Sequence, residues 1–357
     1  MMARRFDKAA MGVLVLTALA AGACGSDEDG DSAGPGAGGS SASGGSGGGT
    51  SGTGGTILLD SGTGGSGGSG TSEAGVGGSG GTDPLTGCGS NLTGIVRDFR
   101  AEHPDFECTK QNPTPYTDPY DKDCGPWDPM IVGALGSSIG PERKPSYAGT
   151  NGTVSTTGTS NFDQWFRDVD GVNMSQDLRL DLVASGNGTF VYDTDRFFPV
   201  DGKLFDADPN NPDRGPFIDD DGNVRNYHFT YELHTTFRYE SDSVFTFRGD
   251  DDVFVYVDDQ LVVNLGGIHV PLQGKLDLGA NRLEVTAPTG SPDLPLDASL
   301  GYTESINGGV AATLSLNLEE GKEYTLDFFF AERNCCGSNF RIETNLVFIE
   351  CGGGVPK

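Results

Sequence analysis

The chain has 357 residues, 57 of them Gly, and a formal net charge of −28. This acidity argues against a nucleic-acid-binding protein, because no basic stripe is present to neutralise phosphates. The length would accommodate two average domains, but Gly, Ser and Thr dominate the first quarter of the chain. About 270 residues therefore remain, enough for one sizeable core.

The N-terminus has the features of a secretion signal. Arg4, Arg5 and Lys8 form a basic region, and residues 9–20 form an apolar stretch that is too short to span a bilayer. The sequence that ends in Cys24 resembles the signal box of bacterial lipoproteins, in which the Cys becomes the lipidated first residue of the mature chain, although Ala21 stands where Leu is usual. We therefore predict a lipoprotein signal peptide over residues 1–24, with an ordinary signal peptide and an incidental Cys24 as the alternative.

A Gly/Ser-rich tether follows the signal. Residues 25–86 contain few apolar side chains and cannot bury enough surface to offset the entropy of ordering, so we predict a disordered linker. A linker of this kind has a root-mean-square span of roughly 40 Å. No acidic retention residue directly follows Cys24. We therefore expect a protein of the bacterial cell envelope, lipid-anchored to the outer membrane or the cell surface.

Six cysteines remain when Cys24 is set aside. Their number is even and the expected compartment is oxidising, so three disulfides are predicted, with their connectivity left open. Zinc is disfavoured, because no Cys-x-x-Cys pair occurs and the chain has only 4 His. The six are Cys88, Cys108, Cys124, Cys335, Cys336 and Cys351.

From Thr86 onward the sequence predicts β-structure. Short apolar or alternating runs recur between clusters of Gly, Pro, Asn and Asp, and long helical periodicity is absent. Residues 253–257 are apolar on both faces, as in a central strand, and alternation places Leu326, Phe328 and Phe330 on one face of another strand. This pattern indicates an all-β sandwich or barrel. The clearest predicted strands are residues 227–239, 244–247, 253–257, 261–265, 312–316, 324–331 and 340–348.

An acidic turn precedes the most apolar of these strands. Asp250, Asp251 and Asp252 stand together, and a second acidic turn, Asp258 and Asp259, ends the strand. Carboxylates a few ångströms apart repel one another unless water or a cation neutralises them. Calcium binds through several oxygen ligands and suits such a turn. A solvated hairpin tip is the alternative.

Several separated blocks of the chain follow one another in an order typical of a known family. The blocks are residues 94–99, 103–107, 164–169, 171–173, 197–202, 226–232, 248–269, 330–333 and 337–342. Together they are similar to the fibro-slime domain, a bacterial relative of the PA14 β-sandwich. The resemblance implies a PA14-like antiparallel β-sandwich over residues 87–357. The sequence departs from the usual pattern at Asp259, where Gly or Asn is common, and at Cys335 and Cys336, where polar residues are common.

The resemblance also implies a chemistry for the acidic turn. In PA14-type lectins and adhesins, two consecutive Asp residues before a strand bind calcium through a cis peptide, and a later loop completes the site. The ion accepts sugar hydroxyls at its open positions. The calcium ligands implied here are Asp250, Asp251, Glu332 and Asn334. The residues expected to contact the bound ligand are Asp252, Arg333, Ser338, Asn339 and Trp165. The ring of Trp165 could stack on a sugar ring, although a core position is favoured. For Arg333, a structural ion pair with Asp252 or Asp258 is favoured.

We therefore expect a lipid-anchored surface protein that binds an extracellular polysaccharide with the help of calcium, in adhesion or matrix attachment. Two alternatives stay open. One is a structural or protein-binding module in which calcium only stabilises the fold. The other is a glycoside hydrolase that uses Asp251 and Glu332. Hydrolases need one carboxylic acid held protonated, whereas acids beside a cation stay ionised, so no enzymatic activity is expected. The sequence does not indicate an oligomeric state.

Overall fold

A computed structural model describes residues 91–107, 127–207, 217–219, 221–288, 294–335 and 337–353. The predicted signal peptide, the tether and Cys24 lie outside these residues, as do four of the six cysteines expected in disulfides. The disulfides therefore stay a prediction. Within the described residues, no helix combines the length and the apolarity that a membrane span requires.

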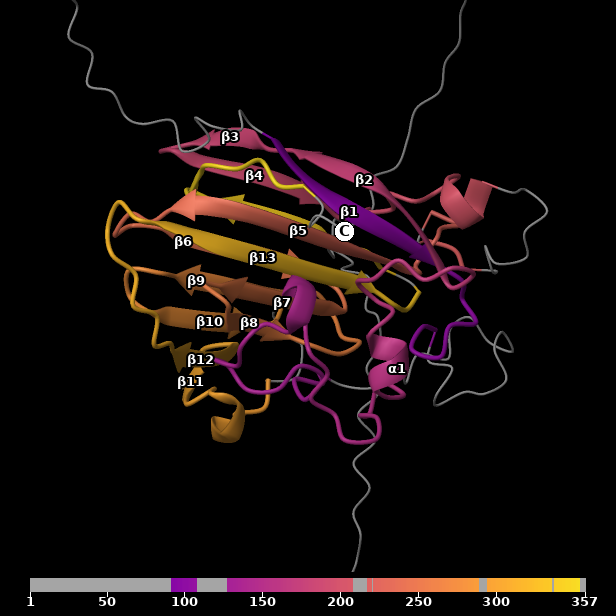
Figure 1. Ribbon diagram of the computed structural model, residues 1–357, viewed down its shortest axis with the longest axis horizontal. Coiled ribbons are helices and arrows are strands. Elements are labelled where there is room, and N and C mark those ends of the chain that lie inside the picture. The colour runs from indigo at the N-terminus through magenta and orange to yellow at the C-terminus, as the bar shows by residue number, and fades with distance from the viewer. Residues whose placement is uncertain are drawn as a thin grey trace, which may run out of the picture. The chain divides into compact units, whose positions relative to one another are not determined.

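Two antiparallel sheets make up the fold (Figure 1). The seven-stranded sheet has the order β2-β1-β5-β13-β7-β8, and β15 pairs with β5 beside this path. Its strands are β1 (Asn91–Phe99), β2 (Asn173–Asp181), β5 (Phe229–Arg238), β7 (Asp252–Val257), β8 (Gln260–Leu265), β13 (Glu323–Glu332) and β15 (Val347–Phe348). The predicted antiparallel sandwich is confirmed.

The eight-stranded sheet has the order β11-β12-β10-β9-β6-β14-β4-β3. Its strands are β3 (Val183–Gly186), β4 (Thr189–Thr194), β6 (Val244–Gly249), β9 (Leu272–Asp277), β10 (Arg282–Thr286), β11 (Glu304–Ile306), β12 (Gly309–Thr313) and β14 (Phe340–Thr344). The helical elements are short: α1 (Thr159–Phe162), η1 (Pro141–Arg143), η2 (Leu204–Ala207) and η4 (Ala298–Leu300).

The seven-stranded sheet is covered on both faces, which explains its apolar central strand. All six residues of β7 are buried. Val253, Val255 and Val257 face the main core between the two sheets. Phe254 and Tyr256 face a second apolar cluster on the outer side of the sheet. A strand buried on both faces reads as a continuous apolar run rather than an alternating one.

The outer cover is a long connection between β1 and β2, which we call the overlay (residues 127–172). It packs Ile131, Phe162, Trp165 and Phe166 against β7 and β13, and Figure 1 shows it in magenta in front of these strands. The overlay contains η1 and α1 but no strand of either sheet. One side of the second apolar cluster therefore comes from a segment without strands, and such a segment cannot be predicted from the alternation typical of strands.

Two of the predicted strands differ from the structure. Residues 312–316 were expected as one strand, yet β12 ends at Thr313. Leu314 and Leu316 are buried, but their amides donate to the backbone oxygen and to the side-chain oxygen of Asn281, at 2.7 and 2.9 Å. Residues 340–348 were also expected as one strand, and they divide into β14 and β15, which belong to different sheets. In both places an apolar pattern reflects burial and not continuous strand pairing.

The turn between β7 and β8 is a two-residue hairpin. Val257 pairs with Gln260, and both turn residues have positive φ, 48° at Asp258 and 65° at Asp259. Two positive φ values define a type I′ turn, in which Asn and Gly are usual. The departure noted at Asp259 is thus an Asp in a conformation that Asp adopts only at a cost.

Candidate functional site

The first acidic turn is buried. The exposed fractions are 6% for Asp250, 3% for Asp251 and 0% for Asp252. The turn leads from β6 in one sheet to β7 in the other, so its side chains enter the space where the two sheets end. Asp251 has a positive φ of 50°, which helps to turn the chain inward. The alternative of a solvated hairpin tip is therefore wrong.

The loop after β13 packs over this turn and supplies its hydrogen-bond donors. The Asn339 amide and side-chain Nδ2 donate to Asp250 Oδ2 at 3.1 and 2.9 Å. The amides of Arg333 and Asn334 donate to Asp251 Oδ2 at 2.7 and 3.0 Å. The structure thus brings together two segments about 80 residues apart, as the resemblance implied.

Glu332 closes the set from the end of β13. Its side chain is completely buried, and neither carboxylate oxygen has a hydrogen-bond partner. Burial, followed by the negative charges of Asp251 and Asp250, raises the pKa of Glu332 well above its usual range, and the nearby Ser338 hydroxyl acts in the opposite direction. A buried polar group without a partner is costly, and a buried charge still more so. Glu332 is therefore the residue of the site that most needs a proton or a cation.

The Asp carboxyls share this condition. Burial raises the pKa of Asp250 to about 7 and that of Asp252 to about 6, and it raises the pKa of Asp251 well above its usual range. Hydrogen bonds from Asn339 to Asp250, and the charge of Arg333 near the other two, act in the opposite direction. Negative charge is thus concentrated where little water can solvate it.

Arg333 is the buried cation beside this cluster, and Asp252 is its partner. Arg333 Nε lies 2.5 Å from Asp252 Oδ2, and both side chains are completely buried. The guanidinium also donates to the backbone oxygens of Asp105 and Ser155, and it lies 4.6 Å from the ring centroid of Trp165. This ion pair ties the β13 end and the first acidic turn to the overlay.

Four residues expected to contact a ligand are scaffold instead. Asp252, Arg333, Ser338 and Trp165 are all 0% exposed, so none of them offers a surface to a sugar. The Ser338 hydroxyl donates to the Phe197 backbone oxygen at 2.8 Å. The stacking role of Trp165 is corrected to the core alternative, because Arg333 covers its ring. Asn339 and Asn334 are half-buried and lie at the solvent side of the cluster.

The donor chemistry of the cluster fits a hard cation. Carboxylate oxygens are the ligands that calcium prefers, and the two unpartnered oxygens of Glu332 lie among them. Gly337 approaches the turn so closely that a Cβ there would lie 2.9 Å from Asp250 Oδ2. In the described part of the chain, however, no group of three or more His, Cys, Asp or Glu side chains is arranged to hold a metal ion. The peptide between Asp250 and Asp251 is trans, not cis as the resemblance implied.

Sequence reasoning missed two buried neighbours of the cluster, Glu107 and His228. Both lie in blocks that carried the resemblance, but no role was assigned to either. The Glu107 amide donates to the Arg333 backbone oxygen at 2.7 Å, and its carboxylate Oε1 lies 2.7 Å from His228 Nε2. Residues this far apart in the chain give no local signal of their proximity. Only the pairing of β1, β5 and β13 in one sheet brings them together.

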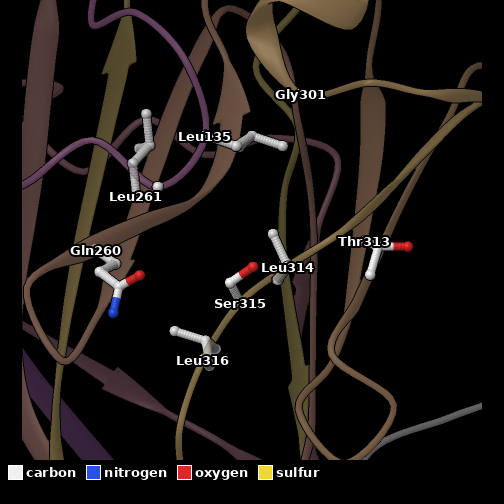
Figure 2. A pocket seen from close by; sticks show the side chains of 9 residues that line it. Leu135, Gln260, Leu261, Gly301, Thr313, Leu314, Ser315 and Leu316 are labelled. Carbon is white, nitrogen blue, oxygen red and sulfur yellow. The ribbon is translucent and has the colours of Figure 1, made fainter.

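A small groove elsewhere in the fold is a poor candidate. Figure 2 shows Gln260 and Leu261 at the start of β8 on one side and residues 313–316 on the other. Its volume of about 110 Å³ is well below the roughly 300–1,000 Å³ of typical small-molecule sites. It contains none of the expected site residues, so the acidic cluster remains the candidate site.

Comparison with known proteins supports the fold and names its type. The chain is 33% identical over 224 residues to the protein psiR of Dictyostelium discoideum, which is 60% of this chain and 19% of psiR. It is 32% identical over 218 residues to psiC of the same organism, 59% of this chain and 34% of psiC. The chain thus spans about a fifth to a third of the length of these relatives. No solved structure matches. The protein is an all-β, two-sheet antiparallel sandwich, and its residues 183–351 match the family model of the PA14 domain.

Proposed function

We propose that this chain is a fibro-slime-type surface lipoprotein of a bacterial cell envelope. Its sandwich binds an extracellular polysaccharide with the help of one calcium ion at Asp250, Asp251, Glu332 and Asn334. The lipid anchor at Cys24 holds it to the outer membrane or cell surface. Membrane and glycan are its partners, and nucleic acid is not. The module acts in adhesion or matrix attachment, by binding and without catalysis.

One observation supports the proposal that a cation binds at this site. Glu332 is completely buried with two unpartnered carboxylate oxygens, and its neighbours Asp250 and Asp251 are themselves negatively charged when ionised. Without a cation, these groups lower their energy only by holding protons. A divalent ion neutralises two of the charges and is bound by the Glu332 oxygens as ligands. The match to the PA14 domain over residues 183–351 supports the same reading.

The protein residues would divide the work as follows. Asp250 and Asp251 are held by the amides of the 333–339 loop, so the turn and the loop form one unit. The Arg333–Asp252 pair fixes this unit to the overlay. Asn334 and Asn339 occupy the half-exposed side, where amide groups hydrogen-bond sugar hydroxyls. A bound calcium ion would accept further hydroxyls at its open positions.

The direct test uses the chain produced without its predicted signal peptide. We expect calorimetry to detect one calcium ion per chain and Asp251→Asn to abolish it. Asp258→Asn, in the exposed turn, is the matched control and should bind normally. A glycan array with calcium and with chelator should show binding only with calcium. If the wild-type chain binds no calcium, the cation site is wrong.

The burial of the cluster favours a second candidate, in which calcium only joins the two loops. Carboxylates that are at most 6% exposed are well placed to stabilise the fold and poorly placed to meet a large ligand. Calcium binding and chelator-sensitive melting without any glycan signal would support this structural role. Release of reducing sugar that Asp251→Asn abolishes would contradict both candidates, because it would show a hydrolase.

A further inference from the structure

The two sheets end in four edge strands, and three of these edges are protected. The overlay covers β8, because Gly136 and Ser137 exchange backbone hydrogen bonds with Leu261, both at 2.8 Å. β11 has three residues, and a β-bulge interrupts the four-residue β3. Covering loops, short strands and bulges keep an edge from pairing with another chain. β2, by contrast, runs for nine residues without a register shift and contains neither Pro nor Lys.

The outer edge of β2 carries a row of outward-pointing backbone groups. Successive residues of a strand point these groups alternately to its two neighbours. In β1, the Phe99 amide donates to the His228 oxygen beside β5, at 2.8 Å, so the odd-numbered residues point to β5 and the even-numbered residues point to β2. Gly94 pairs with Leu178, so the even-numbered residues of β2 bond to β1. The odd-numbered residues of β2 therefore point outward, and within the described chain no strand pairs with them.

The outward-pointing residues also carry charges of both signs. They alternate with Leu178 and Leu180, which pack at the main core, so their side chains lie on the opposite face of the sheet. The exposed ones are Ser175, Asp177, Arg179 and Asp181. Arg179 lies 2.6 Å from Asp181 of its own strand, but both side chains are more than half exposed, and such a surface pair contributes little. This edge can therefore offer its charges to another chain.

The charges of β2 fit a second copy of β2 in one register. Hydrogen-bonded pairs must join odd-numbered residues of both copies, because only these point outward. When Leu178 lies opposite itself on a two-fold axis, Asp177 faces Arg179 twice, and opposite charges directly across a strand pair are stabilising. Centring the pair on Asp177 or on Arg179 instead sets like charges opposite each other. Centring it on Leu180 shortens the overlap within the strand to residues 179–181.

We propose that β2 is a dimerisation edge, at which two copies of this chain join their seven-stranded sheets by antiparallel pairing about Leu178, with Asp177 of each copy opposite Arg179 of the other. The interface is two-fold symmetric. Leu182 alone separates β2 from β3, so both sheets end at the same margin of the fold (Figure 1). Three strands lie between β2 and β7, so pairing at this margin leaves the acidic cluster free. Dimerisation requires neither a cation nor a glycan at that cluster.

The experiment measures the oligomeric state of the chain without its predicted signal peptide, by sedimentation equilibrium over roughly 1 µM to 1 mM, the range of weak specific affinities. Salt at about 0.15 M screens the long-range repulsion between the copies, since the Debye length is then about 8 Å. We expect a concentration-dependent dimer, with the same dissociation constant in calcium and in chelator.

The variants reverse the charges that face each other. Arg179→Asp and Asp177→Arg each set like charges opposite one another, so each should weaken dimerisation at least about tenfold. An equal mixture of these two variants restores opposite charges across the pair and should associate within about threefold of the wild type. Lys275→Asp, at an exposed residue of β9, changes the net charge as Arg179→Asp does and should leave the dimer unchanged.

Three outcomes would overturn the proposal. A chain that stays monomeric at the highest concentration has no such edge. A dimer that Arg179→Asp weakens less than twofold uses another surface. Two variants that do not associate when mixed show that the charges do not face each other. If a charge variant fails to fold, Leu178→Cys decides: the register brings the two Cα atoms to about 4.5 Å, so oxidation should crosslink the copies. Ser175→Cys should not crosslink, and the reverse result contradicts the register.

Discussion

Strand β7 has an acidic turn at each end, and one of these turns is buried whereas the other is exposed. The turn that precedes the strand, Asp250 to Asp252, is at most 6% exposed. In the turn that follows it, the Asp259 side chain is 60% exposed and pairs with Arg143 at 2.9 Å. The two differ in what they connect. The first turn crosses from one sheet to the other and faces inward, whereas the second joins two neighbours of one sheet and projects outward.

This contrast shows that a run of Asp residues in the sequence does not reveal whether their side chains are buried or exposed. The first turn has three consecutive Asp residues and the second has two, and both turns contain an Asp with positive φ. In the buried turn, burial raises the pKa of each Asp carboxyl. The exposed turn is stabilised by ordinary hairpin geometry and by a surface ion pair. Mutations at the two ends of one strand should therefore differ in size and even in sign.

The largest difference is expected between Asp252→Ala and Asp259→Ala. Asp252→Ala leaves the Arg333 guanidinium buried without its carboxylate, so we expect a loss of about 3–5 kcal/mol in the free energy of unfolding. Asp259→Ala removes a partly exposed pair and should cost below about 1 kcal/mol. Urea unfolding followed by circular dichroism measures both. Similar losses for the two variants would show that the first turn is not buried in solution.

Calcium should stabilise the protein through the buried turn alone. At a calcium concentration of 100 times the dissociation constant, one bound ion adds about 2.7 kcal/mol to the free energy of unfolding. We expect this increment, measured between calcium and chelator, to disappear in Asp250→Asn. It should persist in Asp258→Asn, which changes the exposed turn. Loss of the increment in both variants would mean that calcium binds elsewhere or to both turns.

A pH effect is expected behind the exposed turn, where Arg143 bridges Asp259 and Asp327. His234 Nδ1 lies 2.6 Å from Asp327 Oδ1, and its Nε2 lies 3.5 Å from Glu232 Oε2. Burial alone would lower the pKa of His234, but the hydrogen bond to Asp327 and the negative charge of Glu232 raise it overall. A raised pKa means that His234 stabilises the fold most below its unfolded value of about 6.5. This contribution is lost as the pH rises through the higher folded value.

His234→Gln should remove this pH dependence. We expect the variant to lose about 1–2 kcal/mol at pH 6 and less at higher pH, because the hydrogen bonds to charged partners weaken as wild-type His234 deprotonates. His269→Gln is a suitable control, since burial lowers the pKa of His269 to about 4 and keeps it neutral throughout. Unfolding free energies at pH 6, 7 and 8 decide. If the free energy of unfolding rises more from pH 6 to pH 8 in the wild-type protein than in His234→Gln, the raised pKa assigned to His234 is wrong.

The smallest effect is expected from Asp258→Gly. Asp258 has a φ of 48° in the type I′ turn, and Gly adopts this conformation without the steric cost of a Cβ. We expect a gain of about 0.5 kcal/mol, since the greater entropy of the unfolded Gly offsets part of the relief. Thermal unfolding in chelator measures it. A loss of stability would show that the Asp258 side chain makes a contact that matters to the fold.

Much of the β-structure could be predicted because it follows from local patterns. The continuous apolar run of residues 253–257 predicted a central strand, and β7 lies between β13 and β8 with every residue buried. The expected face of Leu326, Phe328 and Phe330 is the one in the main core. The prediction of one strand over residues 340–348 was wrong, because β14 and β15 in this run belong to two different sheets. Alternation reports burial, and only backbone pairing decides where a strand ends.

The site was predictable in its residue types but not in its environment. The resemblance implied that Asp250, Asp251, Glu332, Asn334 and Asn339 lie in one place, and the structure shows Asn339 bonded to Asp250 and Asn334 bonded to Asp251. It also suggested ligand contacts for Trp165 and Ser338, which the structure buries. Their burial comes from the overlay and from the loop before η2, neither of which has a periodic pattern. Desolvation depends on such distant segments and not on neighbours in sequence.

The sequence by itself determined an all-β chain, a central strand apolar on both faces and two acidic turns at its ends. These follow from side-chain periodicity and turn chemistry, which act over a few residues. Only the tertiary structure decided which turn is buried, which of Asp252 and Asp258 pairs with Arg333, and that the Glu107 amide bonds to the Arg333 backbone. These depend on how two sheets and the overlay pack, because the energy of a carboxylate is set by the water it loses and by the charges that distant segments place around it.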